Sequence, residues 1–279
     1  MSTIFDCPVC GQRLERRGKE YICPGGHNYD IASEGYVYLL SPNKKHSKMP
    51  GDDKQMVASR RHFLESGYYR LFSDALNGLT LKALPQEKPV ILDAGCGEGY
   101  YTGRLADFLA ENGKTPEIYG FDISKFAVKA AAKKYRSISF AVGSMFEIPV
   151  SAASADLVTN IFAPIVPEEL ARVVKPGGTM ILAVPGERHL LGLKQILYDS
   201  PYENERRETE YPGFEFRGRV PVRGEIRTED HDVMQSLFKM TPYYWKTPKE
   251  GGERLERAES LQTEIAFDFL VYSRSNAPF

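Results

Sequence analysis

The chain has 279 residues, of which 42% are hydrophobic and 26% are charged. This composition is typical of a globular protein with a full core and one or two domains. Its 36 basic and 37 acidic residues leave a net charge of −1, so the sequence excludes a general affinity for polyanions, and any nucleic-acid contact must come from local basic patches. No apolar stretch reaches the roughly 18 residues of a membrane span, and the first residues lack the pattern of a signal peptide.

The amino-terminal segment predicts a zinc module. Cys7, Cys10, Cys23 and His27 form the pattern C-x2-C-x12-C-x3-H, which supplies three thiolates and one imidazole, a closed tetrahedral set for structural zinc. Such cysteines indicate a reducing cytoplasm rather than a disulfide framework. The residues between the two ligand pairs predict a hairpin over 12–17 and 19–22 that turns at Gly18, and so short a segment depends on the metal for stability. The alternative, a redox dithiol, needs a βαβ setting that this segment lacks.

A basic loop and two helices are expected next. Residues 41–53 hold Lys44, Lys45 and Lys48 among prolines and a glycine, which is typical of a loop and allows phosphate contacts. Helical periodicity follows at 55–65 and 69–79. From residue 89, expected strands at 90–92, 118–121, 139–142, 156–161 and 179–184 alternate with helices at 101–111, 125–135 and 168–174. Further helices are expected at 190–198 and 232–240, and a late strand at 264–272 is expected to join the sheet edge.

This alternation predicts an α/β fold with a doubly wound parallel sheet. We divide the chain into a small zinc-binding domain (1–40), a basic loop and helical linker or lid (41–85), and a domain that holds the doubly wound sheet (86–279).

The most informative segment is the loop after the first strand of that domain. It reads Val-Ile-Leu-Asp-Ala-Gly-Cys-Gly-Glu-Gly-Tyr and places glycines at 95, 97 and 99, where the backbone can turn sharply and approach a ligand closely. Asp122 ends the second strand, at the distance typical of an acid that binds ribose hydroxyls. The spacing G-x-G-x-G differs from the dinucleotide pattern that fits a pyrophosphate. A ligand without a phosphate, S-adenosylmethionine, fits this loop better, although a purely structural glycine-rich turn is the alternative. The loop therefore predicts a class I (Rossmann-like) methyltransferase fold, with residues 86–279 as the S-adenosylmethionine-dependent methyltransferase domain.

Other residues are placed around that cofactor by the strand order. Asp93 or the loop amides can face the methionine end, and Ser144 and Met145, just past the third strand, can meet the adenine. Phosphate contacts are expected from basic residues in four segments. These are Arg13, Arg16, Arg17 and Lys19 of the zinc module, the Lys44–Lys48 loop, Arg60 with Arg61, and Arg217, Arg219, Arg223 and Arg227.

Over most of its length the chain resembles the bacterial 23S rRNA guanine-N1 methyltransferases, some of which confer tylosin resistance. The motifs that carry the resemblance are the two zinc-ligand pairs, Glu34-Gly-Tyr-Val37, Pro50-Gly-Asp52, Arg60-Arg61, Asp93 to Thr102, Asp122-Ile-Ser-Lys125, Ala130 to Tyr135, Ala163-Pro164, Glu169 to Gly178, Pro185-Gly186, Arg188-His-Leu190, and Met240-Thr-Pro242 with Trp245. The resemblance implies that Cys7, Cys10, Cys23 and His27 bind zinc. It also implies that Tyr69, the Gly97–Glu98 backbone and His189 contact S-adenosylmethionine. It suggests a 23S rRNA hairpin as the substrate and a homodimer.

The chemistry sets requirements that the sequence only partly meets. Guanine N1 becomes a nucleophile when its proton leaves and charge builds on O6, so the site needs a base and nearby donors. Asn160 and His189 are candidates because both lie at the carboxyl ends of strands. The run Asn160-Ile-Phe-Ala-Pro164 lacks the Asn-Pro-Pro-aromatic motif of exocyclic-amine methyltransferases, which favours a ring nitrogen. Phe162 is either a stacking platform or a core residue.

Two other functions fit the sequence less well. A small-molecule methyltransferase with an incidental zinc module would act on free metabolites. A zinc-dependent RNA-binding protein with a vestigial cofactor pocket would bind no S-adenosylmethionine, and the intact glycines and Asp122 argue against it.

Overall fold

The computed structural model describes residues 2–41, 50–206 and 210–275. The lysines of the predicted basic loop lie outside these residues. The amino-terminal module is a four-stranded sheet in the order β1-β2-β3-β4. Its strands are β1 (Ser2–Asp6), β2 (Arg13–Arg17), β3 (Glu20–Ile22) and β4 (Asn28–Asp30). The predicted hairpin is confirmed, because β2 and β3 pair antiparallel and Gly18 has a positive φ of 63° at the turn.

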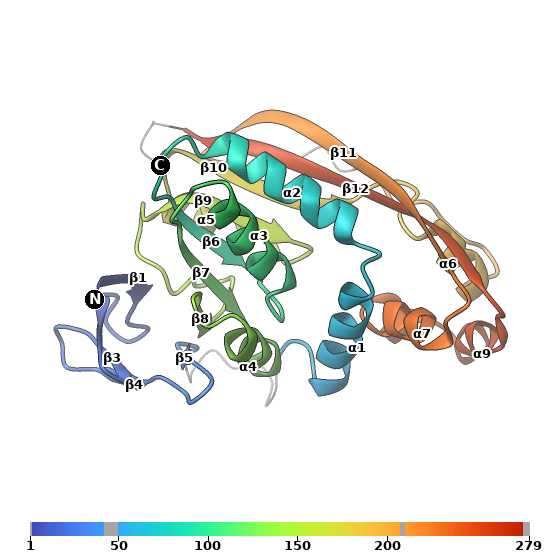
Figure 1. Ribbon diagram of the computed structural model, residues 1–279, viewed down its shortest axis with the longest axis horizontal. Helices are drawn as coiled ribbons and strands as arrows, with labels where there is room; N and C mark the ends of the chain where they lie inside the picture. Colours follow the sequence, from blue (N-terminus) through green and yellow to red (C-terminus); the bar gives the residue numbers. More distant parts are fainter. Residues whose placement is uncertain (1, 42–49, 207–209, 276–279) are drawn as a thin grey trace.

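The rest of the described chain is built on a sheet of eight strands in the order β11-β12-β10-β9-β6-β7-β8-β5 (Figure 1). The strands are β5 (Tyr36–Tyr38), β6 (Val90–Ala94), β7 (Glu117–Asp122), β8 (Ser139–Val142), β9 (Ala155–Ile161), β10 (Val174–Pro185), β11 (Phe214–Thr228) and β12 (Leu261–Arg274). Strands β5 to β10 pair parallel to one another, whereas β12 runs antiparallel to both β10 and β11. The predicted doubly wound sheet is therefore confirmed, with two antiparallel strands added at one end.

Helices line the sheet and extend beyond it. They are α1 (Lys54–Glu65), α2 (Arg70–Ala83), α3 (Tyr100–Glu111), α4 (Lys125–Lys134), α5 (Pro167–Val173), α6 (Leu191–Leu197), α7 (His231–Lys239), α8 (Tyr243–Lys246) and α9 (Lys249–Arg257). Because strand side chains alternate between faces, the sheet has two cores. Ile91 packs in a core with residues of α2, α3 and α4, while its neighbour Leu92 packs in a second core with α5 and the zinc module.

The zinc module docks on that second face through β1. The Phe5 ring lies edge-on to Tyr119, with ring centroids 5.4 Å apart, and Phe5 forms an isolated β-bridge with Val150. The amide of Ser151 donates to the carbonyl of Ile4 at 2.8 Å. The module is therefore attached to the methyltransferase sheet by both apolar contacts and backbone hydrogen bonds.

Two expectations about the sheet require correction. The strand Tyr36–Tyr38 lies within the segment assigned to the zinc domain, yet it pairs with β8 and forms one edge of the large sheet. The late strand, predicted at the sheet edge, is β12 and lies between β10 and β11. The edge is β11, which was not predicted as a strand and which contains Pro221 and two glycines. Proline is tolerated in a strand at a sheet edge. Helices α8 and α9 were not predicted.

Candidate metal centre and cofactor cleft

The four predicted zinc ligands meet at one point. Their ligand atoms all lie within 4.8 Å of one another. The distance from Cys10 Sγ to Cys23 Sγ is 3.6 Å, and His27 Nδ1 lies 3.5 Å from Cys7 Sγ and 3.3 Å from Cys23 Sγ. A tetrahedral site with Zn–S bonds of about 2.3 Å has ligand atoms about 3.5–3.8 Å apart. The donor set and its close clustering therefore fit structural zinc.

Local structure explains why these ligands converge. Gly11 and Gly26 have positive φ angles of 68° and 83°, and their amides donate to the carbonyls of Cys7 and Cys23, which closes the two ligand-bearing turns. The hydroxyl of Tyr29 lies 3.1 Å from Cys7 Sγ. Although burial opposes it, hydrogen bonds from Tyr29 and the backbone lower the pKa of the Cys7 thiol to about 6. A thiolate is the form that binds metal.

The glycine loop lies at the carboxyl end of β6 and, with Asp93 and Asp122, forms the candidate cofactor site. Gly95, Gly97 and Gly99 have φ angles of 85°, 55° and 81°, a left-handed conformation that side chains with a Cβ rarely adopt. A Cβ at Gly95 would lie 2.4 Å from the Cβ of Ala163. Amides of the loop, Gly95 and Cys96, both donate to the carbonyl of Phe121 at the end of β7. The loop is thus held against the strand that delivers Asp122.

Both predicted carboxylates lie beside this loop, Asp93 buried and Asp122 half-buried. Asp122 accepts hydrogen bonds from the amides of Gly97 (3.0 Å) and Ser124 (2.8 Å), and burial raises its pKa. Asp93 accepts from the hydroxyls of Thr102 (2.5 Å) and Thr159 (2.9 Å), and burial raises its pKa to about 6. Each carboxylate oxygen can accept a second hydrogen bond, so Asp122 keeps acceptor capacity for a ribose hydroxyl.

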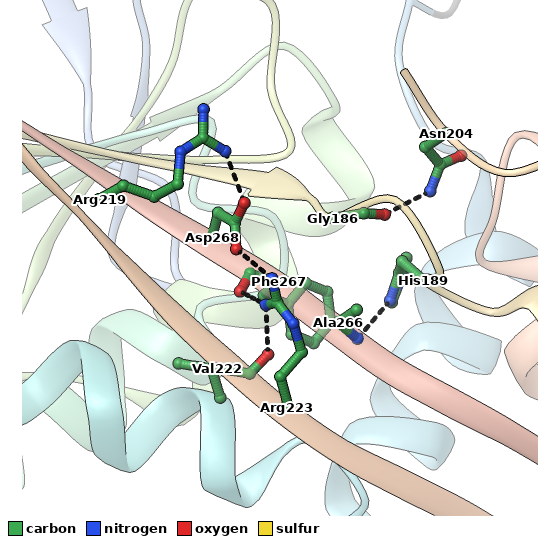
Figure 2. Close-up of polar contacts among 9 residues, drawn as sticks. All are labelled: Gly186, His189, Asn204, Arg219, Val222, Arg223, Ala266, Phe267 and Asp268. Carbon is green, nitrogen blue, oxygen red and sulfur yellow. Dashed lines mark hydrogen bonds and ion pairs between the residues drawn. The ribbon is translucent and has the colours of Figure 1, made fainter. Parts of the chain in front are cut away.

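The structure brings Tyr69 and His189 together although 120 residues separate them. The Tyr69 hydroxyl lies 3.5 Å from His189 Nε2, and both rings contact Phe267. The amide of Ala266 donates to His189 Nδ1 at 3.4 Å (Figure 2), which places the imidazole proton on Nε2, facing Tyr69. Burial, helped by the charge of Lys194, lowers the pKa of His189 to about 3. The imidazole is therefore neutral at physiological pH.

An aromatic ring marks the end of the neighbouring strand β9. Phe162 has a φ of 55°, which is strained for a residue with a side chain. Its ring stacks on Phe72 with centroids 5.7 Å apart, and its side chain is 46% exposed. Asn160 is buried and its amide nitrogen donates to the carbonyl of Pro164 at 3.0 Å. The ring is thus anchored on one side and open on the other.

Helix α1 contributes a cation to the cofactor loop. The sequence assigned Arg60 to RNA contact, but its side chain is only 29% exposed and forms an ion pair with Asp52 at 2.7 Å. Its Nη1 lies 3.5 Å from the position of a Cβ at Gly97. The Ser124 hydroxyl donates to the carbonyl of Asp52 at 2.6 Å. The segment around Asp52 therefore packs on the Asp122–Ser124 turn, and Arg60 faces the glycine loop.

Two further predicted cofactor residues, Glu98 and Ser144, lie in the glycine loop and just after β8. Glu98 is buried within the loop, and Ser144 follows β8, where its hydroxyl accepts from the amide of Phe146 at 3.2 Å. Sequence reasoning missed Thr102 and Thr159, which hold Asp93, and Phe267, which packs between Tyr69 and Phe162. No local pattern marks them, because each acquires its partner only through the tertiary fold.

The fold and the site define the class of protein: an S-adenosylmethionine-dependent methyltransferase with an amino-terminal zinc module. Two family models match, one described as "RlmA, N-terminal" over residues 5–48 and one as "Methyltransferase domain" over residues 85–240. A solved methyltransferase structure from Anaeromyxobacter dehalogenans has the same fold, with a TM-score of 0.51 and 20% identity, covering 74% of this chain and 97% of that one.

Two relatives identify the family. The 23S rRNA (guanine(748)-N(1))-methyltransferase of Streptomyces fradiae is 31% identical over 275 residues, which cover 95% of each chain. A Bacillus subtilis protein described as a 23S rRNA (guanine-N(1)-)-methyltransferase is 31% identical over 277 residues, which cover 96% of each chain. The chain belongs to the 23S rRNA (guanine-N1)-methyltransferase family. The predicted fold class, zinc and S-adenosylmethionine are confirmed. Within the described residues, no helix is both long enough and apolar enough to span a membrane.

Proposed function

We propose that the protein methylates N1 of a guanine in a hairpin of 23S ribosomal RNA, in the cytoplasm. The observation that carries this proposal is the similarity to the Streptomyces fradiae enzyme over 95% of both chains, including the zinc module and the methyltransferase domain. The open ring of Phe162 beside the glycine loop supports it, because a base in a loop or flipped from a helix is commonly stacked on an aromatic side chain.

The proposed roles in cofactor binding follow from the geometry of the glycine loop and its two carboxylates. S-adenosylmethionine supplies an electrophilic sulfonium methyl when it is bound. Asp122 accepts from the ribose hydroxyls, Asp93 keeps the loop in place through its two threonines, and the Gly97–Glu98 backbone approaches the cofactor closely. The neutral His189 and Tyr69 contribute hydrogen-bonding groups from the opposite side. These residues chiefly supply alignment, which is worth roughly 7–11 kcal/mol in a well-oriented transfer.

Guanine recognition falls to the carboxyl ends of β9 and β10. The side-chain nitrogen of Asn160 donates to the carbonyl of Pro164. The side-chain oxygen of Asn160 is left as an acceptor for the N1 or N2 protons of guanine. His189 holds its proton on Nε2, so it acts as a neutral donor in this arrangement rather than as a charged acid. Zinc is structural, because its four positions are filled by protein. A homodimer is part of the proposal and follows from the family resemblance.

Transfer of a labelled methyl group tests the proposal against its two alternatives. The zinc-loaded protein is incubated with methyl-tritiated S-adenosylmethionine and either unmodified 23S rRNA or a small-metabolite extract. Label in the RNA fraction alone supports the proposal. Label only in small molecules supports a small-molecule methyltransferase, and absence of cofactor uptake supports an RNA-binding protein with a vestigial pocket.

A further inference from the structure

One carboxylate of the sheet is shared by two arginines. Asp268 lies on β12 with a side chain only 7% exposed, and it accepts from Arg219 Nη1 at 2.5 Å and from Arg223 Nη2 at 2.7 Å (Figure 2). Two guanidinium groups therefore face the same carboxylate. A buried carboxylate with two fixed cations also holds both guanidinium planes in place.

The two arginines differ in how much of the side chain is exposed to solvent. The side chain of Arg219 is 17% exposed, whereas that of Arg223 is 52% exposed. Arg223 is nevertheless fixed, because its Nη1 donates to the carbonyls of Phe267 (2.5 Å) and Val222 (3.0 Å). A guanidinium that is held on one side and open on the other loses little conformational entropy when it binds an anion.

Arg223 lies at the carboxyl end of β10, where the expected substrate enters. Phe267 pairs with Val222 on one side and with Pro185, the last residue of β10, on the other. The Nη2 of Arg223 lies 3.4 Å from the position of a Cβ at Gly186. Gly186 begins the turn in which its carbonyl accepts from the amide of His189 at 3.1 Å. The open guanidinium is therefore next to the turn that presents His189 to Tyr69.

The other predicted arginines of β11 are paired differently. Arg217 and Arg227 each form an ion pair at 2.7 Å with the glutamate two residues earlier on the same strand, Glu215 and Glu225. Each of these pairs is one cation with one anion and lies on the exposed surface. Among these four arginines, Arg223 alone combines a fixed guanidinium, an open side and a position next to the turn at Gly186.

We propose that Arg223, positioned by Asp268, binds an RNA phosphate next to the target guanosine. The guanidinium of Arg223 is fixed on one side and open on the other, and its N–H donors fit the two free oxygens of a phosphodiester. The site fixes the nucleotide by its backbone, while Phe162 and Asn160 contact the base. This inference rests on the proposed function.

Charge removal at Arg223 tests the site. The variants are Arg223→Gln, Arg223→Lys, and as a charge-matched control Arg257→Gln on α9, whose side chain is 79% exposed and pairs with Glu253 at 3.3 Å. Hairpin RNA binding is measured as a function of KCl concentration. Loss of one phosphate contact lowers the slope of log affinity against log salt by about 0.7–0.9 for Arg223→Gln. Arg257→Gln retains the wild-type slope, and Arg223→Lys is intermediate. S-adenosylmethionine affinity, unchanged in all three, shows that each variant is folded.

A substrate change locates the contact. After the methylated guanine has been mapped, the phosphates on either side of it are replaced one at a time by uncharged methylphosphonates. We expect one replacement to slow single-turnover methylation by the wild type about tenfold and to have no further effect on Arg223→Gln. Equal slowing of both proteins, or an unchanged salt slope in Arg223→Gln, overturns the inference while the proposed function stands. If the wild type methylates no RNA, both fall.

Discussion

At the residue scale, the glycine loop of the candidate cofactor site needs left-handed backbone conformations that residues with a side chain rarely adopt. Gly95 has a φ of 85° and lies so close to β9 that an added Cβ would be 2.4 Å from Ala163. The spacing of the glycines predicts the tight turn, because alternate glycines directly after a buried strand have few other uses. It does not predict the contact with Ala163, which follows from the parallel pairing of β6 with β9.

The variant Gly95→Ala separates these two effects when it is compared with Gly113→Ala. Gly113 also has a positive φ, of 75°, but nothing lies within 4 Å of the position of its Cβ. We expect Gly113→Ala to lower the free energy of unfolding by about 1 kcal/mol, the cost of the left-handed conformation alone. Gly95→Ala should cost about 2–4 kcal/mol because the overlap adds to that strain, and it should weaken S-adenosylmethionine binding. Urea unfolding measures the free energy lost in each variant, and equal losses would contradict the close approach of Gly95 to Ala163.

The protonation state of His189 is a second prediction at this scale. Burial lowers its pKa from 6.5 to about 3, so the folded state resists protonation. Because the unfolded chain is protonated at this residue more readily than the folded one, the free energy of unfolding is highest above pH 6.5 and falls as the pH drops from 6.5 toward 3. Between pH 8 and pH 5 the imidazole Cε1–H resonance, assigned with a His189→Gln variant, should keep its neutral shift. A titration midpoint near 6.5 would show that the ring is solvated and not held between Tyr69 and Ala266.

At the scale of elements, local spacing predicts what local contacts build. The zinc hairpin and the glycine loop follow from residues close in sequence, and both are confirmed. The sheet edges do not follow, because edge position depends on partners far along the chain. Tyr36–Tyr38 pairs with β8 about 100 residues later, and β11 extends through Pro221 because its partner β12 supplies a continuous antiparallel register.

The zinc module gives the prediction for this scale. The strands β2 to β4 carry few buried side chains besides Leu14 and Tyr21, so the metal should supply most of their stability. Removal of zinc with a chelator, or Cys23→Ser, should abolish amide-exchange protection in residues 13–30. The central strands β6, β9 and β10 should stay protected, because their core lies within the methyltransferase sheet. Retained protection in residues 13–30 without metal would assign their stability to the docking of β1 instead.

At the scale of the whole molecule, the site is assembled from distant segments. Tyr69 precedes α2, His189 follows β10, and Phe267 lies on β12, yet their side chains meet in one cluster. The family resemblance points to Tyr69 and His189, but sequence spacing alone does not, because nothing local relates two residues 120 positions apart. The shared carboxylate of Asp268 likewise depends on the register of β11 against β12.

The proposed function is the delivery of a methyl group from the candidate cofactor site to a ring nitrogen of guanine in 23S rRNA. The most direct test digests unmodified 23S rRNA to nucleosides after treatment with the zinc-loaded protein and S-adenosylmethionine, and identifies the product by mass spectrometry against standards. The account predicts 1-methylguanosine, at about one residue per RNA molecule, at a guanine in a hairpin. Methylation on the exocyclic amine or on adenine, or no modified nucleoside despite bound cofactor, would contradict it.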